Sequence, residues 1–312
     1  MANGQNVHIN VPLSNFAAES YKQAPLIWNQ IFPVLPVMKS SDKYKKFDGS
    51  GLINNNLKLE RTRGEEAKQI LFQSTDDTYT TEELTARYFI HRDDDANADS
   101  IMKLDQRITQ RLTNQIGIQI EVKAKTLVEN TSTFTDATPG VKWDAANTDA
   151  MDIEGDIDTG KIAIAKACGV RPNTIVIPED IAKVVKKNAA IRELIKYTQS
   201  DLLVNGDLPP SIFNLKVIIP GAINNASALG QSPSGAFAWN ADKVEILYVE
   251  PPSISCMGVG VSFCNSSYGA QGWRVKKYDD KAKDGRWIEV GWNGKSVVTN
   301  ASAGYIINDP LT

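Results

Sequence analysis

The sequence predicts an α+β fold, and three observations lead to this prediction. Apolar residues recur every three or four positions over residues 100–128, which is typical of one long amphipathic helix. Residues 151–220 alternate helical patterns with short apolar runs typical of buried strands, and residues 236–312 carry mainly strand patterns. Residues 1–75 show neither pattern over a long stretch, so we expect an arm and a loop there.

Composition and charge exclude several classes of protein. The 312 residues carry a net charge of −3, which gives no basic surface of the kind that sequence-specific nucleic-acid binding needs. The first 13 residues lack the pattern of a secretion signal, and no apolar run is long enough to span a membrane, so we expect no membrane partner. Cys168, Cys256 and Cys264 form no CxxC motif and are expected to be buried, reduced thiols.

The arm, residues 1–38, is rich in apolar side chains but is interrupted by four prolines. Because proline fixes φ and lacks an N–H donor, this segment cannot form one long helix or a central strand. We predict a short helix followed by an extended segment over residues 32–37. The apolar side chains of such an arm must be covered by the folded body or by another subunit, and we assign Trp28, Phe32 and Val34 to contacts between subunits.

The loop, residues 39–75, is polar and charged, with strand-like alternation at residues 44–47 and 57–59. Its central part is too polar to have its own core, so we predict a long two-stranded loop that projects from the body. Residues 39–68 carry more basic than acidic side chains, whereas residues 76–105 carry an excess of acidic ones.

The remaining elements follow from periodicity and from helix-ending residues. The helix over residues 100–128 has a length of roughly 43 Å at 1.5 Å per residue, enough for a spine against which other elements lie. A second helix is predicted from residue 151 to Cys168 and ends at Gly169. Shorter helices are predicted at residues 179–187 and 189–198. Strands are predicted at residues 174–178, 216–220, 236–239, 243–250, 272–277, 286–292 and 296–299.

Three patterns resemble catalytic or metal-binding motifs only superficially. Residues 291–296 (GWNGKS) have two residues between the glycines where a phosphate-binding loop has four, so we predict a hairpin turn at Asn293–Gly294. Asp93, Asp94 and Asp95 near His91 lack a second ligand cluster, and we interpret them as a solvated acidic turn. Asp152, Asp156 and Asp158 lack the glycine and glutamate of a calcium loop and are interpreted as the polar face of a helix.

No catalytic, cofactor-binding or metal-binding residue is therefore predicted, and we expect a protein that is not an enzyme and needs no cofactor. The aromatic residues of the C-terminal third fall at strand spacing and are expected to pack in a core.

The order of these elements resembles that of the major capsid proteins of tailed double-stranded-DNA bacteriophages, whose fold is shared with herpesviruses. The resemblance covers nearly the whole chain and rests on collinear pieces, none of which is specific alone. These pieces are residues 32–37 (FPVLPV) and 41–44 (SDKY), 77–83 (DTYTTEE), the long helix from Ser100, 171–178 (RPNTIVIP), 191–198 (IRELIKYT), 243–249 before Pro251-Pro252, and 303–307 (AGYII).

The resemblance implies a division of the chain into the parts of that fold. Residues 1–38 correspond to the N-terminal arm and residues 39–75 to the extended β-hairpin loop. Residues 76–160 and 236–312 correspond to the peripheral domain with its long spine helix. Residues 161–235 correspond to the axial domain, whose tip surrounds the five-fold and six-fold axes.

The resemblance also implies a function and partners. We expect a structural protein that self-assembles into pentamers and hexamers, forming an icosahedral shell around viral double-stranded DNA, which it contacts non-specifically. The virion is the expected location, after assembly in the host cytoplasm. A separate scaffolding protein is expected because the arm begins almost at Met1, and a portal and a decoration protein are further expected partners. Whether subunits crosslink covalently is left open, although the loop carries lysines.

Two alternatives remain open. Another virion structural protein, such as a tail-tube subunit, would be β-rich and would not need a long spine helix. An acidic hydrolase that uses Asp93 to Asp95 would show a dependence on metal ions.

In a shell, opposite charges would direct how one subunit docks on the next. We therefore hypothesise that the basic loop of one subunit lies over the acidic start of the spine helix in its neighbour. The residues assigned to this contact are Lys43, Lys45, Lys46, Arg61 and Arg63 on the loop, and Asp93, Asp94 and Asp95 on the neighbour.

Overall fold

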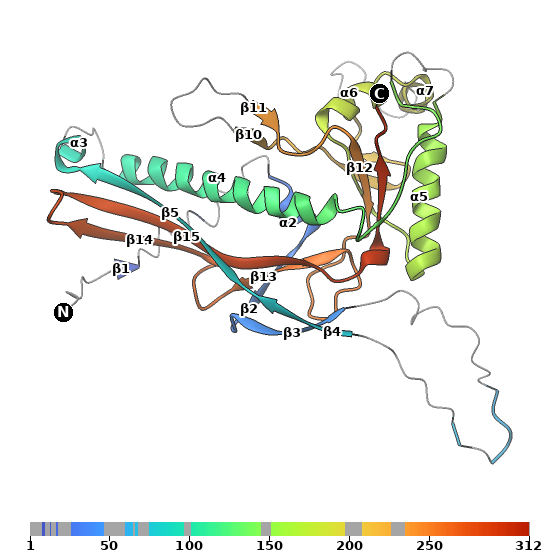
Figure 1. The fold of residues 1–312 in the computed structure, drawn as a ribbon, viewed down its shortest axis with the longest axis horizontal. Helices are drawn as coiled ribbons and strands as arrows, with labels where there is room; N and C mark the ends of the chain where they lie inside the picture. Colours follow the sequence, from blue (N-terminus) through green and yellow to red (C-terminus); the bar gives the residue numbers. More distant parts are fainter. Residues whose placement is uncertain are drawn as a thin grey trace.

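Two sheets and one long helix organise the chain (Figure 1). The computed structural model describes residues 8–9, 13, 17, 26–46, 60–64, 66–67, 75–96, 101–144, 151–196, 208–225 and 235–311. The long helix lies along the first sheet, and the second sheet stands at the C-terminal end of that helix, beside shorter helices (Figure 1).

The first sheet is built around one long strand, β15 (Gly285–Val298). Along one edge of β15, its first part pairs with β14 (Trp273–Asp280) and its last part pairs with β13 (Gly260–Asn265). Along the other edge β15 pairs with β5 (Glu82–His91). Two short strands complete the sheet: β1 (His8–Ile9), which pairs with β14, and β2 (Val34–Val37), which runs parallel to β13.

The spine helix α4 (Ile101–Val128) confirms the predicted helix. Its apolar residues recur every three or four positions, so they form one stripe that faces the first sheet. Ile116 and Ile120 of this stripe share the largest apolar core of the described residues with Val290 and Trp292 of β15. This packing fixes the helix along the sheet.

The second sheet has six strands in the order β6-β16-β12-β7-β9-β8. One face packs against α5 (Ile153–Cys168), α6 (Glu179–Val185) and α7 (Ala189–Lys196) in a second apolar core. The opposite face joins the core of the first sheet through Val176, Leu247 and Ile306, among others. The strands are β6 (Thr135–Ala137), β7 (Thr174–Val176), β8 (Ser211–Ile212), β9 (Leu215–Ile218), β12 (Lys243–Leu247) and β16 (Gly304–Asn308).

Local capping signals set the ends of these helices. The Asp152 side chain accepts a hydrogen bond from the backbone N–H of Gly155 at the start of α5, and Gly169 ends α5 in the left-handed region at φ +73°. Asn188 accepts from the backbone N–H of Ile191 at the start of α7, so the predicted break between the two shorter helices is confirmed.

Smaller elements complete the description. A two-stranded ribbon of β3 (Ser41–Lys46) and β4 (Thr75–Thr80) forms the base of the predicted loop, whose second expected strand, at residues 57–59, lies outside the described residues. A second ribbon consists of β10 (Ile223–Asn225) and β11 (Gly235–Phe237). The short helices are α2 (Trp28–Ile31), α3 (Arg92–Ala96) and the 3-10 helix η4 (Ala301–Ala303).

The predicted hairpin turn at Asn293–Gly294 is wrong. Both residues lie inside β15, which continues without interruption, and Gly294 pairs with Glu82 on one side and Cys264 on the other. A Cβ at Gly294 would lie 2.5 Å from the Trp292 ring and 2.8 Å from the Phe263 carbonyl oxygen. The glycine is thus required by close packing in a sheet interior, not by a turn.

The sheets also divide the chain differently from the predicted boundaries. The boundary between residues 160 and 161 falls within α5, which packs as one helix on the second sheet. Strands β12 and β16 were expected in the peripheral part, but both pair within the second sheet. Their pairing partners are distant in sequence, so the local pattern did not reveal them.

Candidate functional site

The arm residues that we assigned to neighbouring subunits lie instead in the core of the same chain. Trp28 and Phe32 have no exposed surface, and Val34 is partly buried where β2 pairs with β13. The Trp28 ring packs edge-on against Trp292, with ring centroids 5.8 Å apart. An arm segment that supplies core residues to its own fold cannot offer the same side chains to a neighbour, so this assignment is corrected for Trp28 and Phe32.

A buried carboxylate on the spine helix holds the arm in place. Glu121 has no exposed surface, and one of its oxygens accepts hydrogen bonds from the backbone N–H groups of Ile27 (3.0 Å) and Trp28 (2.9 Å). Its other oxygen accepts from Trp239 Nε1 at 2.7 Å. Burial raises the pKa of Glu121, while these three donors act to lower it. Glu121 thus joins three segments that are far apart in sequence.

The base of the loop is held by three aromatic rings. Tyr79 of β4 stacks on Phe263 of β13, with ring centroids 4.1 Å apart and an angle of 16° between the planes. Tyr44 of β3 meets the same ring at 5.6 Å, and all three rings are buried. Burial raises the pKa of Tyr44 to about 12, and its hydroxyl donates to Asp77 at 3.2 Å. These contacts fix the ribbon of β3 and β4 to the first sheet.

The predicted basic residues of the loop fall into two groups. Lys45 pairs with Asp76 at 2.5 Å and Lys46 lies 3.9 Å from Asp77, so both lysines face carboxylates on the neighbouring strand of their own ribbon. Lys43 is exposed on the same ribbon. Arg61 and Arg63 are likewise exposed, so these three cations remain accessible to a neighbour.

The predicted acidic residues lie on α3, at the opposite end of β5 from the loop base (Figure 1). Asp93 and Asp94 are exposed, and Asp93 lies 3.5 Å from His91 Nδ1, while the side chain of Asp95 lies outside the described part. Since β5 has ten residues at about 3.3 Å each, roughly 33 Å separates its ends. The loop base and α3 therefore do not meet within one subunit.

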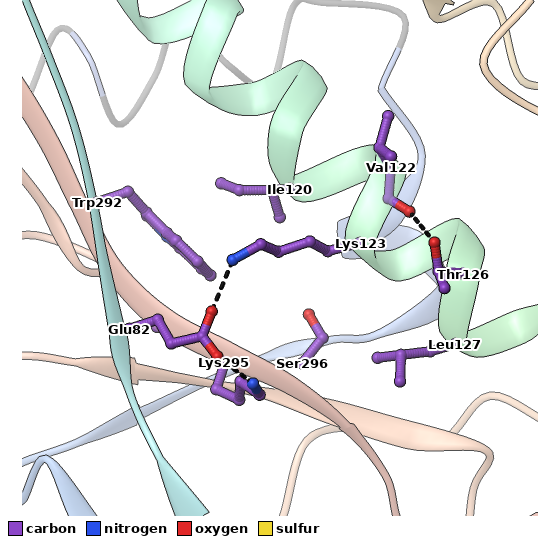
Figure 2. A pocket seen from close by; sticks show the side chains of 10 residues that line it. Glu82, Ile120, Val122, Lys123, Thr126, Leu127, Trp292, Lys295 and Ser296 are labelled. Atoms are coloured by element: carbon purple, nitrogen blue, oxygen red, sulfur yellow. Dashed lines mark hydrogen bonds and ion pairs between the residues drawn. The ribbon is translucent and has the colours of Figure 1, made fainter.

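A cavity of about 310 Å³ opens where β5, α4 and β15 come together (Figure 2). Glu82 bridges two cations there: Lys123 of α4, at 2.6 Å, and Lys295 of β15. Hydrogen bonds from both lysines lower the pKa of Glu82 to about 2. The Ser296 hydroxyl, which also lines the cavity, is hydrogen-bonded to Ser262 at 2.7 Å. This arrangement ties the helix to the sheet and sets up no nucleophile or general base.

The other suspected chemical motifs have structural roles. Asp152 caps α5, Asp156 accepts from Trp143 Nε1 at 2.8 Å, and Asp158 pairs with Lys161 at 2.6 Å. In the part of the chain that the structure describes, no three His, Cys, Asp or Glu side chains are grouped to hold a metal ion. The three cysteines are free and buried, as predicted.

No helix among the described residues combines the length and the apolar character needed to cross a membrane. An arm anchored on a spine helix, a long sheet under that helix, a ribbon fixed to the sheet by aromatic rings and a second sheet with its own helices together define the class: this is the capsid fold of tailed phages.

Comparisons with known proteins identify the family. The family model described as phage capsid protein matches residues 75–290, more than half of the chain, and the chain belongs to this family. The major capsid protein of Burkholderia phage BcepMu is 28% identical over 217 residues, which cover 67% of this chain and 68% of that protein. The protein is thus a structural component of a phage capsid shell, part of the virion, and copies of it assemble with one another.

Solved structures agree on the fold. A phage-related protein from Bordetella bronchiseptica RB50 superposes with a TM-score of 0.73 at 20% identity and covers 98% of both chains. A chain from the capsid of cyanophage P-SCSP1u has a TM-score of 0.61 at 8% identity, covering 91% of this chain and 88% of the other.

Proposed function

We propose that the chain is the major capsid subunit, which assembles into pentamers and hexamers that close an icosahedral shell around double-stranded DNA. The observation that carries the proposal is the match of two thirds of the chain to the major capsid protein of a Burkholderia phage. The long α4 and the α/β second sheet argue against a tail-tube subunit, which would be β-rich.

The two sheets suggest how the proposed domains divide. The first sheet with α4 forms the peripheral domain. The second sheet, which includes β12 and β16, forms the axial domain together with α5, α6 and α7. The protein acts without catalysis or a cofactor, assembles in the host cytoplasm and contacts DNA non-specifically. A separate scaffolding protein, a portal and a decoration protein are its proposed partners.

Assembly of the purified chain tests this function. With scaffold supplied, we expect closed shells or their capsomers in negative-stain micrographs, and we expect their yield to be unchanged by a chelator or by a thiol reductant. The reason is that the described residues group no metal ligands and the cysteines are unpaired. A chain that stays a compact monomer at high concentration, or that forms open tubes, would contradict the proposal.

For the contact between subunits, we propose that the loop cations Lys43, Arg61 and Arg63 dock on Asp93 and Asp94 of the neighbour. The exposure of all five side chains and the distance between loop base and α3 within one chain support a contact between chains. Lys45 and Lys46 are not part of this proposed contact, because they face Asp76 and Asp77 on their own ribbon.

Charge reversal tests this contact. Lys43→Glu with Arg61→Glu and Arg63→Glu should reduce shell yield at least several-fold, because complementary charges steer association. Adding Asp93→Lys and Asp94→Lys in the same chain should recover part of the yield. Lys183→Glu, an exposed reversal on α6, serves as the matched control. The contact is wrong if the combined variant recovers nothing while the monomers remain folded by circular dichroism.

A further inference from the structure

Glu245 is a glutamate in the middle of a buried strand, β12, and its side chain has no exposed surface. No other residue that the structure describes is hydrogen-bonded to either carboxyl oxygen. Its direct neighbours across the sheet are Val176 of β7 and Ile306 of β16, which are also fully buried and carry no polar side-chain atom. The carboxyl group therefore lies in apolar surroundings, on the sheet face that meets the core around α4.

Among the described residues, Glu129, Lys243 and Lys125 act on Glu245 through their charge, and these three groups already interact with one another. The Lys125 ammonium of α4 lies 3.5 Å from the carboxylate of Glu129, just beyond the end of that helix. Lys243, on the same strand as Glu245, donates to the backbone carbonyl oxygen of Glu129 at 2.7 Å. The Glu129 carboxylate also accepts from the backbone and side-chain amides of Asn240. Neither lysine is hydrogen-bonded to Glu245.

An ionised carboxylate that is buried without a partner costs far more free energy than a neutral one, so such a group binds a proton instead. Burial raises the pKa of Glu245 well above its usual range, and the negative charge of Glu129 raises it further, while Lys243, the backbone N–H of Glu245 itself and Lys125 lower it. This conformation therefore favours the neutral acid at Glu245 over the carboxylate.

We propose that Glu245 is a proton-binding site at the joint between the spine helix and the second sheet, and that loss of its proton loosens this joint. The O–H bond of the carboxyl group breaks, the proton passes to solvent, and the carboxylate keeps the electron pair. The anion then needs a cation, and Lys243 is the lysine on its own strand. Turning Lys243 towards Glu245 removes its hydrogen bond to Glu129, one of the bonds that tie the end of α4 to β12.

The sign of the pH dependence follows from the raised pKa. The folded chain keeps the Glu245 proton at a pH where the unfolded chain has already released it, above a pKa of about 4.3. The stabilising effect of this proton is complete below that pH and is lost as the pH rises to the folded-state pKa. Over this window the equilibrium constant for unfolding should rise about tenfold per pH unit relative to a chain without the group.

Comparison of the full-length chain with Glu245→Gln tests the proposal without any need for shells, so its outcome is independent of the proposed function. Glutamine has the same shape and cannot ionise. We expect the wild-type chain to lose stability relative to Glu245→Gln as pH rises from 4.5 to 8, measured by tryptophan fluorescence in denaturant. Glu179→Gln, at an exposed position of α6, should follow the wild-type chain. Parallel pH profiles for wild type and Glu245→Gln would overturn the proposal.

Two further measurements separate a proton site from a merely structural residue. Infrared spectra at neutral pH should contain the C=O stretch of a protonated carboxyl that is missing from Glu245→Gln. Hydrogen exchange of amides at residues 125–129 should accelerate with pH more steeply in the wild-type chain than in the variant. If Glu245→Gln does not fold, Glu245→Met replaces it, and failure of both neutral side chains to fold would also overturn the proposal.

Discussion

Replacing Glu121 with leucine should lower the free energy of unfolding by about 3–5 kcal/mol. The change removes the acceptor of three buried donors, the N–H groups of Ile27 and Trp28 and the indole N–H of Trp239. Each buried donor left without a partner costs about 1–3 kcal/mol. Denaturant unfolding followed by tryptophan fluorescence would measure the loss, and hydrogen exchange should show faster exchange at the two backbone amides.

The matched control for this prediction is Gln119→Leu, an exposed position on the same helix, which should change the stability by no more than about 0.5 kcal/mol. Glu121→Gln should fall between the two, since it keeps one carbonyl acceptor and places an NH₂ group against the remaining donors. A loss below about 1 kcal/mol for Glu121→Leu would show that the arm is held by apolar packing alone.

Elements with strong local signals could be predicted from the sequence. The apolar stripe gave the spine helix to within one residue at its start, because a period of 3.6 needs no information from the rest of the chain. The α5 helix followed in the same way from its periodicity and from Gly169. Strand β5 was missed because it is largely exposed and polar, and it is a strand only because β15 lies beside it.

The polar residues that join the elements could not be predicted. Glu82, Glu121 and Glu245 are ordinary glutamates in the sequence, and their importance comes from groups brought to them by distant segments. The sequence did indicate that the apolar arm must be covered. It contained no signal to decide whether the cover comes from the same chain, as it does for Trp28 and Phe32, or from a neighbour.

The arm is covered by its own chain, whereas the exposed cations of the loop have room for contacts with a neighbouring subunit. From Leu26 to Phe32 the arm is part of the core, so its variants should act on the stability of the single chain. The exposed cations of the loop contribute little to that stability, because ion pairs at an exposed surface contribute only about 0–1 kcal/mol. Stability of the monomer and yield of shells should thus respond to different residues.

Breaking the buried ion pair between Asp105 and Arg286 should have an effect as large as the loss of Glu121. Arg286 Nη1 of β15 lies 2.7 Å from Asp105 Oδ1 at the start of α4, and less than a tenth of either side chain is exposed. Lys277 of β14 donates to the other oxygen at 2.8 Å. Asp105→Leu removes this carboxylate from beside the buried Arg286 guanidinium, and breaking a buried ion pair in this way should cost about 3–5 kcal/mol of unfolding free energy.

The double variant Asp105→Leu with Arg286→Met should recover most of this loss, because it removes both buried charges of the pair and the partly exposed Lys277 can turn to solvent. Arg92→Ala breaks a second arginine–aspartate pair, 3.8 Å from Asp284 at the exposed end of the same sheet, and should cost less than about 1 kcal/mol. Denaturant midpoints of the four chains complete the comparison. If the double variant is no more stable than Asp105→Leu alone, the loss comes from a packing defect at the start of the spine helix and not from the buried charge of Arg286.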